Sequence, residues 1–167
     1  MLTISKISND IKLRKYAKDI FITPLELAKK HIDMIDYKPN DLWLDPCKNN
    51  GSYYNQYPTE YKEYCEILEN KDFFDYTGEP DIIVQNPPYS LMDLWIEKNI
   101  QLQPRIISFL IGIGNLTTKR IEKLEQAGYG LTKMKMLKVW KWYGMSCIVV
   151  FEKDKNSIIE YDRTIYR

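Results

Sequence analysis

One segment of the sequence constrains the fold more than any other: residues 105–111, which read RIISFLI. A strand with one face in water alternates apolar and polar residues, whereas this run is nearly all apolar. We therefore expect residues 105–111 to form a central strand that is covered on both faces. Such a strand needs a packing layer on each side of its sheet, which helices between parallel strands can supply.

The other elements expected from the sequence alternate between strand and helix patterns. Short apolar runs that stop at turn residues or prolines predict strands, and the run at 42–44 stops at Asp45 and Pro46. The expected strands are 42–44, 64–68, 81–85, 105–111, about 133–139 and 146–152, and the expected helices are 24–35, 90–100 and 117–127. This alternation predicts an α/β fold with a doubly wound, mostly parallel sheet.

The helix at 24–35 carries the clearest start signal. Thr23 is expected as its N-cap, Pro24 as its first residue and Glu26 as the partner that completes a capping box. Residues 1–20 hold five basic and two acidic side chains and are expected to form a basic N-terminal arm, although a solvated tail fits equally well. No repeat or linker divides the rest, so we expect a single domain over residues 21–167.

The charge and hydropathy of the chain exclude two classes of function. Its 167 residues include 24 Lys and Arg against 23 Asp and Glu, which excludes a generally basic nucleic-acid coat protein. The mean hydropathy is −0.44, and no run approaches the roughly 20 apolar residues of a membrane helix, so no membrane contact is expected. The N-terminus has no apolar signal segment, and we expect a cytoplasmic protein, in the host cytoplasm if the source is a phage or virus.

The cysteines and the histidine exclude further chemistry. Cys47, Cys65 and Cys147 match neither a disulfide framework nor the paired spacing of a zinc site, so we expect reduced thiols. The single histidine, His31, falls within an expected helix, where packing or partial exposure is its expected role. One histidine leaves almost no residues from which a Ser-His-Asp triad or a histidine metal site could be built, and no metal is expected.

The tetrapeptide at 86–89 is the most informative motif. Pro87 and Pro88 hold the backbone extended, which fixes the Asn86 amide and the Pro87 carbonyl as neighbouring acceptors beside the flat ring of Tyr89. Two acceptors aimed at the hydrogens of an exocyclic amine concentrate its lone pair for attack on an electrophilic methyl group. The same four residues could also be a turn that only ends a strand, so their context decides between the two readings.

That context resembles the S-adenosylmethionine-dependent amino-type DNA methyltransferases, specifically the N6-adenine class in its small phage- or virus-like form. The resembling elements occur in order and span residues 21–89. They are an F-x-T-P element (Phe21, Thr23, Pro24), a first-strand loop (Asp45, Pro46, Cys47 through Gly51), an acid ending the second strand (Glu66), a D-F-F element (Asp72, Phe73, Phe74) and an intact N-P-P-Y (Asn86, Pro87, Pro88, Tyr89). The resemblance implies a Rossmann-like class I methyltransferase fold with an antiparallel C-terminal strand.

The resemblance also implies residue roles, each with a plain structural alternative. Asp45 and its loop would cradle the amino-acid end of S-adenosylmethionine, and the alternative is a turn former. Glu66 would hold the ribose hydroxyls, and the alternative is a surface acid. Asp72 would accept the adenine amine while Phe73 packs on the ring, and an acid followed by core aromatics fits equally well.

One residue departs from the family pattern. Asn49 stands two residues before Gly51, where the family usually has a glycine that lets the backbone approach the cofactor. Asparagine tolerates positive φ better than other residues with a side chain, so the turn can survive. The asparagine side chain still takes space, which keeps open the alternative of a catalytically inactive relative.

A basic and aromatic stretch near the expected last strands is a candidate nucleic-acid surface. Lysines with interleaved aromatics can follow a phosphate backbone and stack a displaced base, while a solvated hairpin face fits almost equally well. Its residues are Lys133, Lys135, Lys138, Trp140, Lys141 and Trp142. Since an adenine cannot be reached inside a duplex, the target base must be flipped or single-stranded, with Tyr89 as its stacking partner.

The sequence as a whole predicts transfer of a methyl group to N6 of adenine in nucleic acid, DNA in preference to RNA. Only about 15 residues follow Phe151, so we expect either weak sequence specificity or a second subunit or partner chain that supplies recognition. Two alternatives remain: a glutamine-amide methyltransferase acting on protein, and an inactive subunit that binds nucleic acid or a partner protein.

Overall fold

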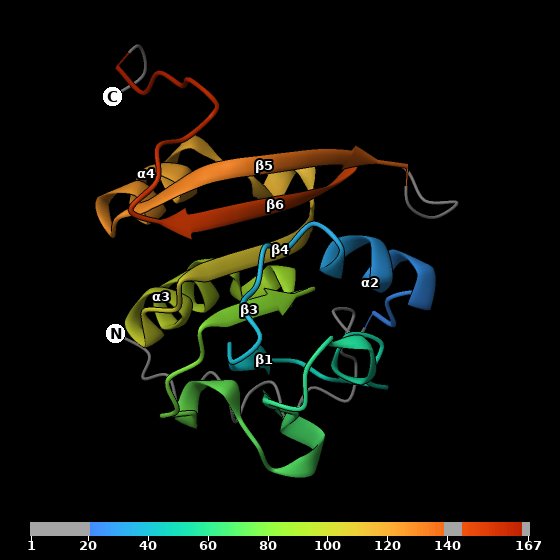
Figure 1. Ribbon diagram of the computed structural model, residues 1–167. Coiled ribbons are helices and arrows are strands. Elements are labelled where there is room, and N and C mark those ends of the chain that lie inside the picture. Colours follow the sequence, from blue (N-terminus) through green and yellow to red (C-terminus); the bar gives the residue numbers. More distant parts are fainter. Residues whose placement is uncertain (1–20, 139–144, 165–167) are drawn as a thin grey trace.

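The computed structural model describes residues 21–138 and 145–164, and a six-stranded sheet runs through this part of the chain (Figure 1). In spatial order the strands are β2 (Lys62–Tyr64), β1 (Trp43–Asp45), β3 (Ile82–Gln85), β4 (Ile106–Gly112), β6 (Ser146–Lys153) and β5 (Tyr129–Leu137). The first four are parallel, whereas β6 is antiparallel to β4 and to β5. The predicted α/β fold, with a doubly wound, mostly parallel sheet and an antiparallel C-terminal strand, is confirmed.

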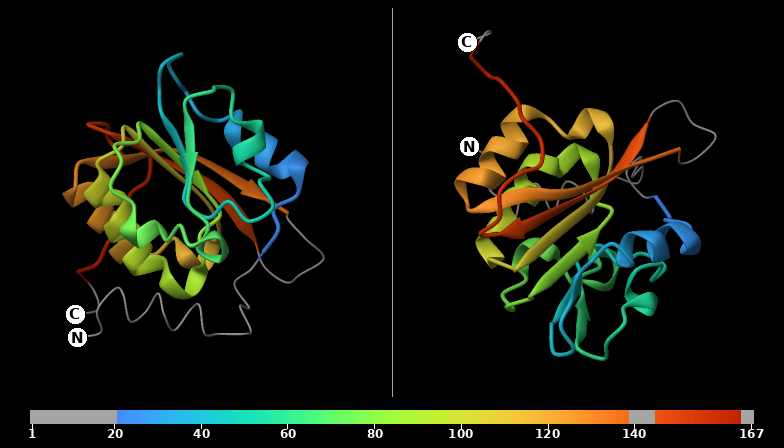
Figure 2. Two further views of the ribbon diagram at one scale, coloured as in Figure 1. Left: turned by 90° about the horizontal axis from the view of Figure 1, so that it is seen from below. Right: turned by 45° about the horizontal axis from the view of Figure 1, so that its top comes forward.

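Helices cover both faces of the sheet (Figures 1 and 2). Helix α2 (Leu25–Ile32) packs on one face, and helices α3 (Met92–Leu102) and α4 (Thr118–Gln126) pack on the other. Strand β4 contributes to both cores, with Ile106 and Leu110 toward α2 and Ile107 and Phe109 toward α3 and α4. All four side chains are at most 2% exposed, as expected for a central strand. In the described residues no helix has the length and apolar character needed to cross a bilayer.

Short 3₁₀ turns complete the connections. They are η1 (Tyr54–Gln56), η2 (Ile67–Glu69), η3 (Phe73–Asp75), η4 (Tyr89–Leu91) and η5 (Ile113–Asn115). The strand expected at 64–68 is wrong in its extent, because β2 ends at Tyr64 and the chain then turns back. Glu66 pairs with Lys71 across an isolated bridge, and Asn70, at φ 59°, closes the turn between them.

The predicted capping box is also wrong. Pro24 is the residue that precedes the first helical position of α2, and no side chain caps the helix. Thr23 is buried and hydrogen-bonds Asn86, so its hydroxyl is committed to a tertiary contact. The helix ends at Ile32, three residues earlier than expected, since the N–H groups of Met34 and Ile35 form tighter turns onto the carbonyls of residues 31 and 32.

Strand β5 begins at Tyr129, four residues earlier than expected. The register between β5 and β6 shifts between Leu131 and Lys133, where a bulge interrupts the alternation of side chains. The segment before the bulge is strand nonetheless, with Tyr129 and Leu131 buried in the core. A bulge of this kind masks the period-two pattern from which a strand is predicted.

Candidate active site

Two predicted polar clusters meet at the point where the strand order reverses. Strands β2 and β3 lie on opposite sides of β1, so the carboxyl ends of β1 and β3 frame the switch point of the sheet. The Cys47 thiol, whose pKa burial raises, donates to the Asn86 carbonyl oxygen at 3.2 Å. The Asn86 Nδ2 group donates to Thr23 Oγ1, also at 3.2 Å. The fold therefore joins three elements that are separate in the sequence: the F-x-T-P element, the loop after β1 and the N-P-P-Y segment.

Asp45 ends β1 and is the most strongly perturbed acid of this site. Its side chain is 1% exposed, and Oδ1 accepts a 3.2 Å hydrogen bond from the Cys47 backbone N–H. Oδ2 is buried and has no hydrogen-bond partner in the part of the chain that the structure describes. Burial raises the Asp45 pKa to about 7, against the opposing effect of the Cys47 and Tyr54 backbone N–H groups. A cation placed against Oδ2 would give this oxygen a partner and would stabilise the ionised form of the carboxylate.

The loop after β1 keeps a tight turn with asparagine in the place of a glycine. Asn49 has φ 50°, within the left-handed region that asparagine tolerates, and Gly51 has φ 84°. A side chain at Gly51 would also clash, because a Cβ atom there would lie 2.6 Å from Asn55 Nδ2. The expectation that the turn survives at Asn49 is confirmed.

Glu66 holds this loop from the turn that follows β2. Its Oε2 atom accepts a 2.7 Å hydrogen bond from the Asn49 backbone N–H, and Oε1 accepts a 3.1 Å bond from Leu68 N–H. Glu66 is therefore ordered and is not a free surface acid. Each oxygen keeps a lone pair that can accept a further donor, such as a hydroxyl group.

The N-P-P-Y segment follows β3 directly. Asn86 is half-buried and Pro87 is buried. Among the described residues no donor reaches Asn86 Oδ1, since the hydrogen bond to Thr23 occupies the nitrogen end of the amide. The arrangement presents an acceptor oxygen whose opposite end is fixed.

Tyr89 lies in η4 at the end of this segment. Its ring is 40% exposed, and its hydroxyl accepts a 3.1 Å hydrogen bond from the Gly112 backbone N–H at the end of β4. The hydroxyl contact orients the ring while much of its surface faces solvent. An aromatic face held in this way can stack on a planar group.

The D-F-F element lies partly in the core. Phe73 is 2% exposed and packs in the core against Trp95, with ring centroids 4.7 Å apart. This burial matches the alternative of a core aromatic, and the packing of Phe73 on a bound ring stays a prediction. Asp72 is itself 9% exposed, and its Oδ1 accepts a 3.0 Å hydrogen bond from Phe74 N–H.

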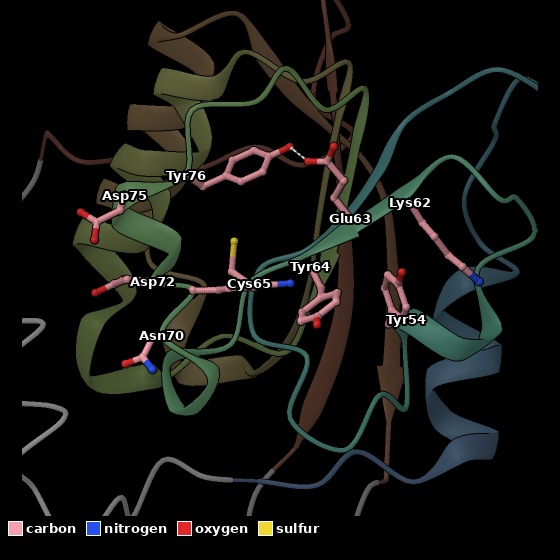
Figure 3. A pocket seen from close by; sticks show the side chains of 10 residues that line it. Tyr54, Lys62, Glu63, Tyr64, Cys65, Asn70, Asp72, Asp75 and Tyr76 are labelled. Carbon is pink, nitrogen blue, oxygen red and sulfur yellow. Dashed lines mark hydrogen bonds between the residues drawn. The ribbon is translucent and has the colours of Figure 1, made fainter.

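A pocket of about 450 Å³ adjoins the Asp72 side of the site along β2 (Figure 3). On one side the Tyr76 hydroxyl donates to Glu63 at 2.7 Å, and Tyr54 and Lys62 lie on the other side. Its lining residues are Tyr54, Lys62, Glu63, Tyr64, Cys65, Asn70, Lys71, Asp72, Asp75 and Tyr76. Neither Asp45 nor the N-P-P-Y segment lines it, so this pocket borders the switch point and does not coincide with it.

The remaining members of the predicted cofactor set lie around the same loops. Phe21 and Pro24 flank Thr23 and are exposed, with Phe21 at 41%. Pro46 and Gly51 are buried within the loop after β1. The structure thus gathers the Phe21–Pro24 element and the residues after β1 at one edge of the sheet.

The predicted nucleic-acid stretch does not form one continuous basic surface in the described residues. Lys133 is engaged by the segment that follows helix α2, because its Nζ atom donates to the Met34 carbonyl at 2.9 Å and to Asp36 at 2.7 Å. Lys135 and Lys138 are exposed. Three further members of the prediction, Trp140, Lys141 and Trp142, lie outside the described residues.

The sequence analysis did not predict the buried contact between His31 and Tyr53. Both are buried, at 0% and 4% exposure, and His31 Nδ1 lies 2.9 Å from the Tyr53 hydroxyl. Burial lowers the His31 pKa to about 3, so the ring is neutral. His31 and Tyr53 are far apart in the sequence, so no spacing of residues could have indicated their contact.

The fold is that of the class I methyltransferases, as comparison with solved structures shows. The chain resembles precorrin-6y C5,15-methyltransferase from Geobacter metallireducens with a TM-score of 0.61 and 15% identity over 79% of this chain and 90% of that one. It resembles the E. cuniculi Mtq2–Trm112 complex, described as responsible for methylation of the eRF1 translation termination factor, with a TM-score of 0.58 and 15% identity over 82% and 99%.

A third similar structure is described as a modification subunit of a type I restriction enzyme from Vibrio vulnificus. Its TM-score is 0.56 at 12% identity, over 92% of this chain and 48% of that chain. No protein-family model matches the sequence, and no curated protein sequence matches it either. At identities of 12–15% the similarity defines the fold, while the substrate has to be argued from the site.

Proposed function

We propose that this chain is an S-adenosylmethionine-dependent methyltransferase that methylates N6 of adenine in nucleic acid, DNA in preference to RNA. One observation carries the proposal: at the switch point, the Asn86 amide is held through its nitrogen, and its oxygen has no donor among the described residues. The adjoining Pro87 carbonyl is the second acceptor, and the exposed Tyr89 ring lies next in the chain.

The residues of the site fit the cofactor. Asp45 Oδ2 is a buried carboxylate oxygen with no partner among the described residues, and the ammonium group of S-adenosylmethionine would pair with it. Glu66 would accept the ribose hydroxyls with its remaining lone pairs, and Asp72 would accept the adenine amine. The other proposed cofactor residues are Phe21, Thr23, Pro24, Pro46, Cys47 and Gly51.

When bound, this cofactor supplies an electrophilic methyl group carried on a sulfonium centre. The chain's own contribution is to orient the acceptor and to tune its amine. Asn86 Oδ1 and the Pro87 carbonyl accept the two amine hydrogens, which localises the nitrogen lone pair for in-line attack. No strong base is required before transfer, and the surplus proton leaves to solvent afterwards.

Tyr89 would receive the target base. A flipped or single-stranded adenine can stack on its ring, which the Gly112 contact orients. Of the predicted nucleic-acid stretch, Lys135 and Lys138 are the described candidates for phosphate contacts, because Lys133 is engaged by the segment that follows helix α2. One structural neighbour is described as a modification subunit of a restriction enzyme, and we propose that a partner subunit supplies recognition of the target sequence.

A second candidate function is methylation of a protein glutamine amide. A glutamine side chain also presents a planar NH₂ group, and one structural neighbour is described as methylating a translation termination factor. The F-x-T-P and D-F-F elements favour a nucleobase instead. A third candidate, a subunit that binds without transferring a methyl group, is motivated by Asn49, and failure to bind S-adenosylmethionine in calorimetry would favour it.

The test is methyl transfer from labelled S-adenosylmethionine to single-stranded DNA, duplex DNA, RNA and protein, followed by nucleoside mass analysis. We expect N6-methyladenine in DNA. Label in glutamine would support the second candidate, and a folded chain that labels none of the four would refute the proposed enzyme as a self-sufficient unit.

Asn86→Ala tests whether the Asn86 amide activates the substrate amine. Because the amide oxygen acts only on the reacting amine, we expect turnover to fall at least about a hundredfold, while cofactor affinity in calorimetry stays within a few-fold of the parent chain. Asn156→Ala, at an exposed position beyond β6, is the matched control and should leave turnover unchanged. An active Asn86→Ala chain would contradict the assigned role.

A further inference from the structure

A buried line of polar groups crosses the α2 face of the core and reaches the candidate active site. His31 Nε2 lies 2.6 Å from Ser108 Oγ, and Ser108 Oγ donates to the Val149 carbonyl at 2.9 Å. At its other nitrogen, His31 meets the Tyr53 hydroxyl at 2.9 Å. His31 and Ser108 are fully buried, so these groups have no water to replace a lost partner.

The Val149 carbonyl fixes the direction of every hydrogen bond in this line. A carbonyl can only accept, so the single hydroxyl hydrogen of Ser108 points to it. Ser108 must then accept from His31, which places the imidazole hydrogen on Nε2. The neutral ring leaves Nδ1 as an acceptor, and Tyr53 donates its hydroxyl hydrogen there.

The same direction continues to Asn86. With its hydrogen committed to His31, the Tyr53 oxygen can only accept, and a hydrogen bond from the Thr23 hydroxyl opposes the rise in the Tyr53 pKa. Thr23 Oγ1 then accepts from Asn86 Nδ2 at 3.2 Å. Reversal of the Asn86 amide would set two acceptor oxygens against each other at Thr23.

We propose that Ser108, His31, Tyr53 and Thr23 form a one-directional hydrogen-bond relay that positions the Asn86 amide with its oxygen toward the substrate amine. This inference rests on the proposed function for its catalytic meaning. Thr23, Tyr53 and His31 are positioning residues, since none of them has to contact the reacting atoms. The relay assigns a role to a buried histidine that the chemistry of the transfer does not use.

The tautomer of His31 is a direct readout that does not depend on activity. The chain has a single histidine, so untagged full-length protein labelled with ¹⁵N-histidine gives one unambiguous pair of ring nitrogen signals. We expect a neutral ring protonated on Nε2 between pH 5 and pH 8. An Nδ1–H tautomer or an imidazolium in the parent chain would overturn the relay.

Tyr53→Phe removes one hydroxyl and keeps the ring. Thr23 then loses its acceptor and becomes free to donate to Asn86 Oδ1, which would occupy the oxygen needed by the substrate. We expect kcat to fall roughly tenfold with KM for the cofactor unchanged, and the Asn86 side-chain NH₂ signals to shift. These signals are identified by their loss in Asn86→Ala. Tyr129→Phe, which removes an equally buried hydroxyl bonded to the Pro104 carbonyl, is the matched control and should change neither.

A double-mutant cycle separates the relay from a general loss of packing. If Tyr53 acts through Thr23, then Tyr53→Phe should have little further effect on kcat in a Thr23→Val background. Thr23→Ser keeps the hydroxyl and should retain most of the activity. Additive losses would overturn the relay, as would a Thr23→Val chain with unchanged kcat and unchanged Asn86 signals. Where Tyr53→Phe does not fold, the Thr23→Val and Thr23→Ser pair carries the test.

Ser108→Ala acts at the far end of the relay. Without the serine acceptor, a hydrogen on Nε2 would be buried unpaired, so the Nδ1–H tautomer becomes favoured and the direction of the line reverses. We expect the ¹⁵N pattern of His31 to change and kcat to fall, and an unaltered tautomer would overturn the relay. A parent chain that transfers no methyl group refutes the proposed function instead, and the relay is then decided by the His31 and Asn86 signals.

Discussion

Asp45 lies at the end of β1 with one oxygen hydrogen-bonded and the other buried, where no described residue donates to it. Desolvation of a carboxylate is costly, and the cost appears here as a pKa raised to about 7 from an ordinary value of 3.8. The unfolded chain ionises this group at the lower pH, so the protonated form favours the folded state. The stability contributed by this preference is fully present below about pH 4 and is lost as the pH rises through 7.

Asp45→Asn removes the titration while retaining the size of the side chain. The neutral amide carries no cost of burial that grows with pH. We therefore expect the stability of the variant, relative to that of the parent chain, to rise by about 2–3 kcal/mol from pH 5 to pH 8. Urea unfolding of both chains at the two pH values measures this gain.

Asp41→Asn is the matched control for that measurement. Asp41 is also buried, but its carboxylate pairs with Arg105. Removing the charge leaves the guanidinium without its partner, so this variant should lose stability at both pH values. Equal stability differences for Asp45→Asn at pH 5 and pH 8 would show that its carboxylate is not perturbed in the folded chain.

At the scale of elements, the strands that frame the site could be predicted because prolines mark where they end. Asp45-Pro46 and Asn86-Pro87-Pro88 stop β1 and β3 within one residue of the observed bounds. The apolar run of β4 likewise predicted its central position. The sequence therefore contained the switch point and the residues that flank it.

Elements governed by tertiary contacts could not be predicted in the same way. Thr23 carries a capping signature, yet its hydroxyl bonds Asn86, which is distant in the sequence. The resemblance implies that Phe73 packs on a bound ring, yet Trp95 covers it. The bulge between Leu131 and Lys133 hides the start of β5. In each case a long-range contact overrides a local preference, and the link from His31 to Asn86 escaped prediction for the same reason.

The contact between β5 and the segment after α2 distinguishes two lysines that look alike in the sequence. Lys133 bonds the Met34 carbonyl and Asp36, whereas Lys135 is exposed on the same strand. We expect Lys133→Ala to lower the free energy of unfolding by about 1 kcal/mol, and Lys135→Ala to change it by less than about 0.5 kcal/mol. Chemical denaturation of both variants checks this.

For nucleic-acid binding, we expect Lys135→Ala to have a larger effect than Lys133→Ala. If Lys135 contacts a phosphate, its loss should weaken binding and reduce the slope of log affinity against log salt by about one, while Lys133→Ala leaves that slope unchanged. Fluorescence anisotropy at several salt concentrations measures both. An unchanged slope in Lys135→Ala would remove this residue from the proposed nucleic-acid surface.

At the scale of the whole molecule, the pKa of an aspartate lies near neutral pH while the pKa of the histidine lies well below it. The formal net charge of +1 counts His31 as neutral, and its pKa of about 3 keeps it so throughout the neutral range. Asp45, with a pKa of about 7, changes charge in the range usually left to histidine. Among the described residues, a side chain with a pKa near neutral therefore lies at the switch point of the sheet.

Proton exchange with the buffer follows from the unpaired oxygen of Asp45. At pH 6 most molecules hold a proton on this carboxyl group, and a bound ammonium group would lower its pKa and expel that proton. The heat of S-adenosylmethionine binding at pH 6, where the ligand's own amino group is already an ammonium, should then vary with the ionisation enthalpy of the buffer, and the variation should vanish in Asp45→Asn. Calorimetry in two buffers would thus count the protons that leave as the ligand enters, and a count of zero at pH 6 would mean that the cation binds elsewhere.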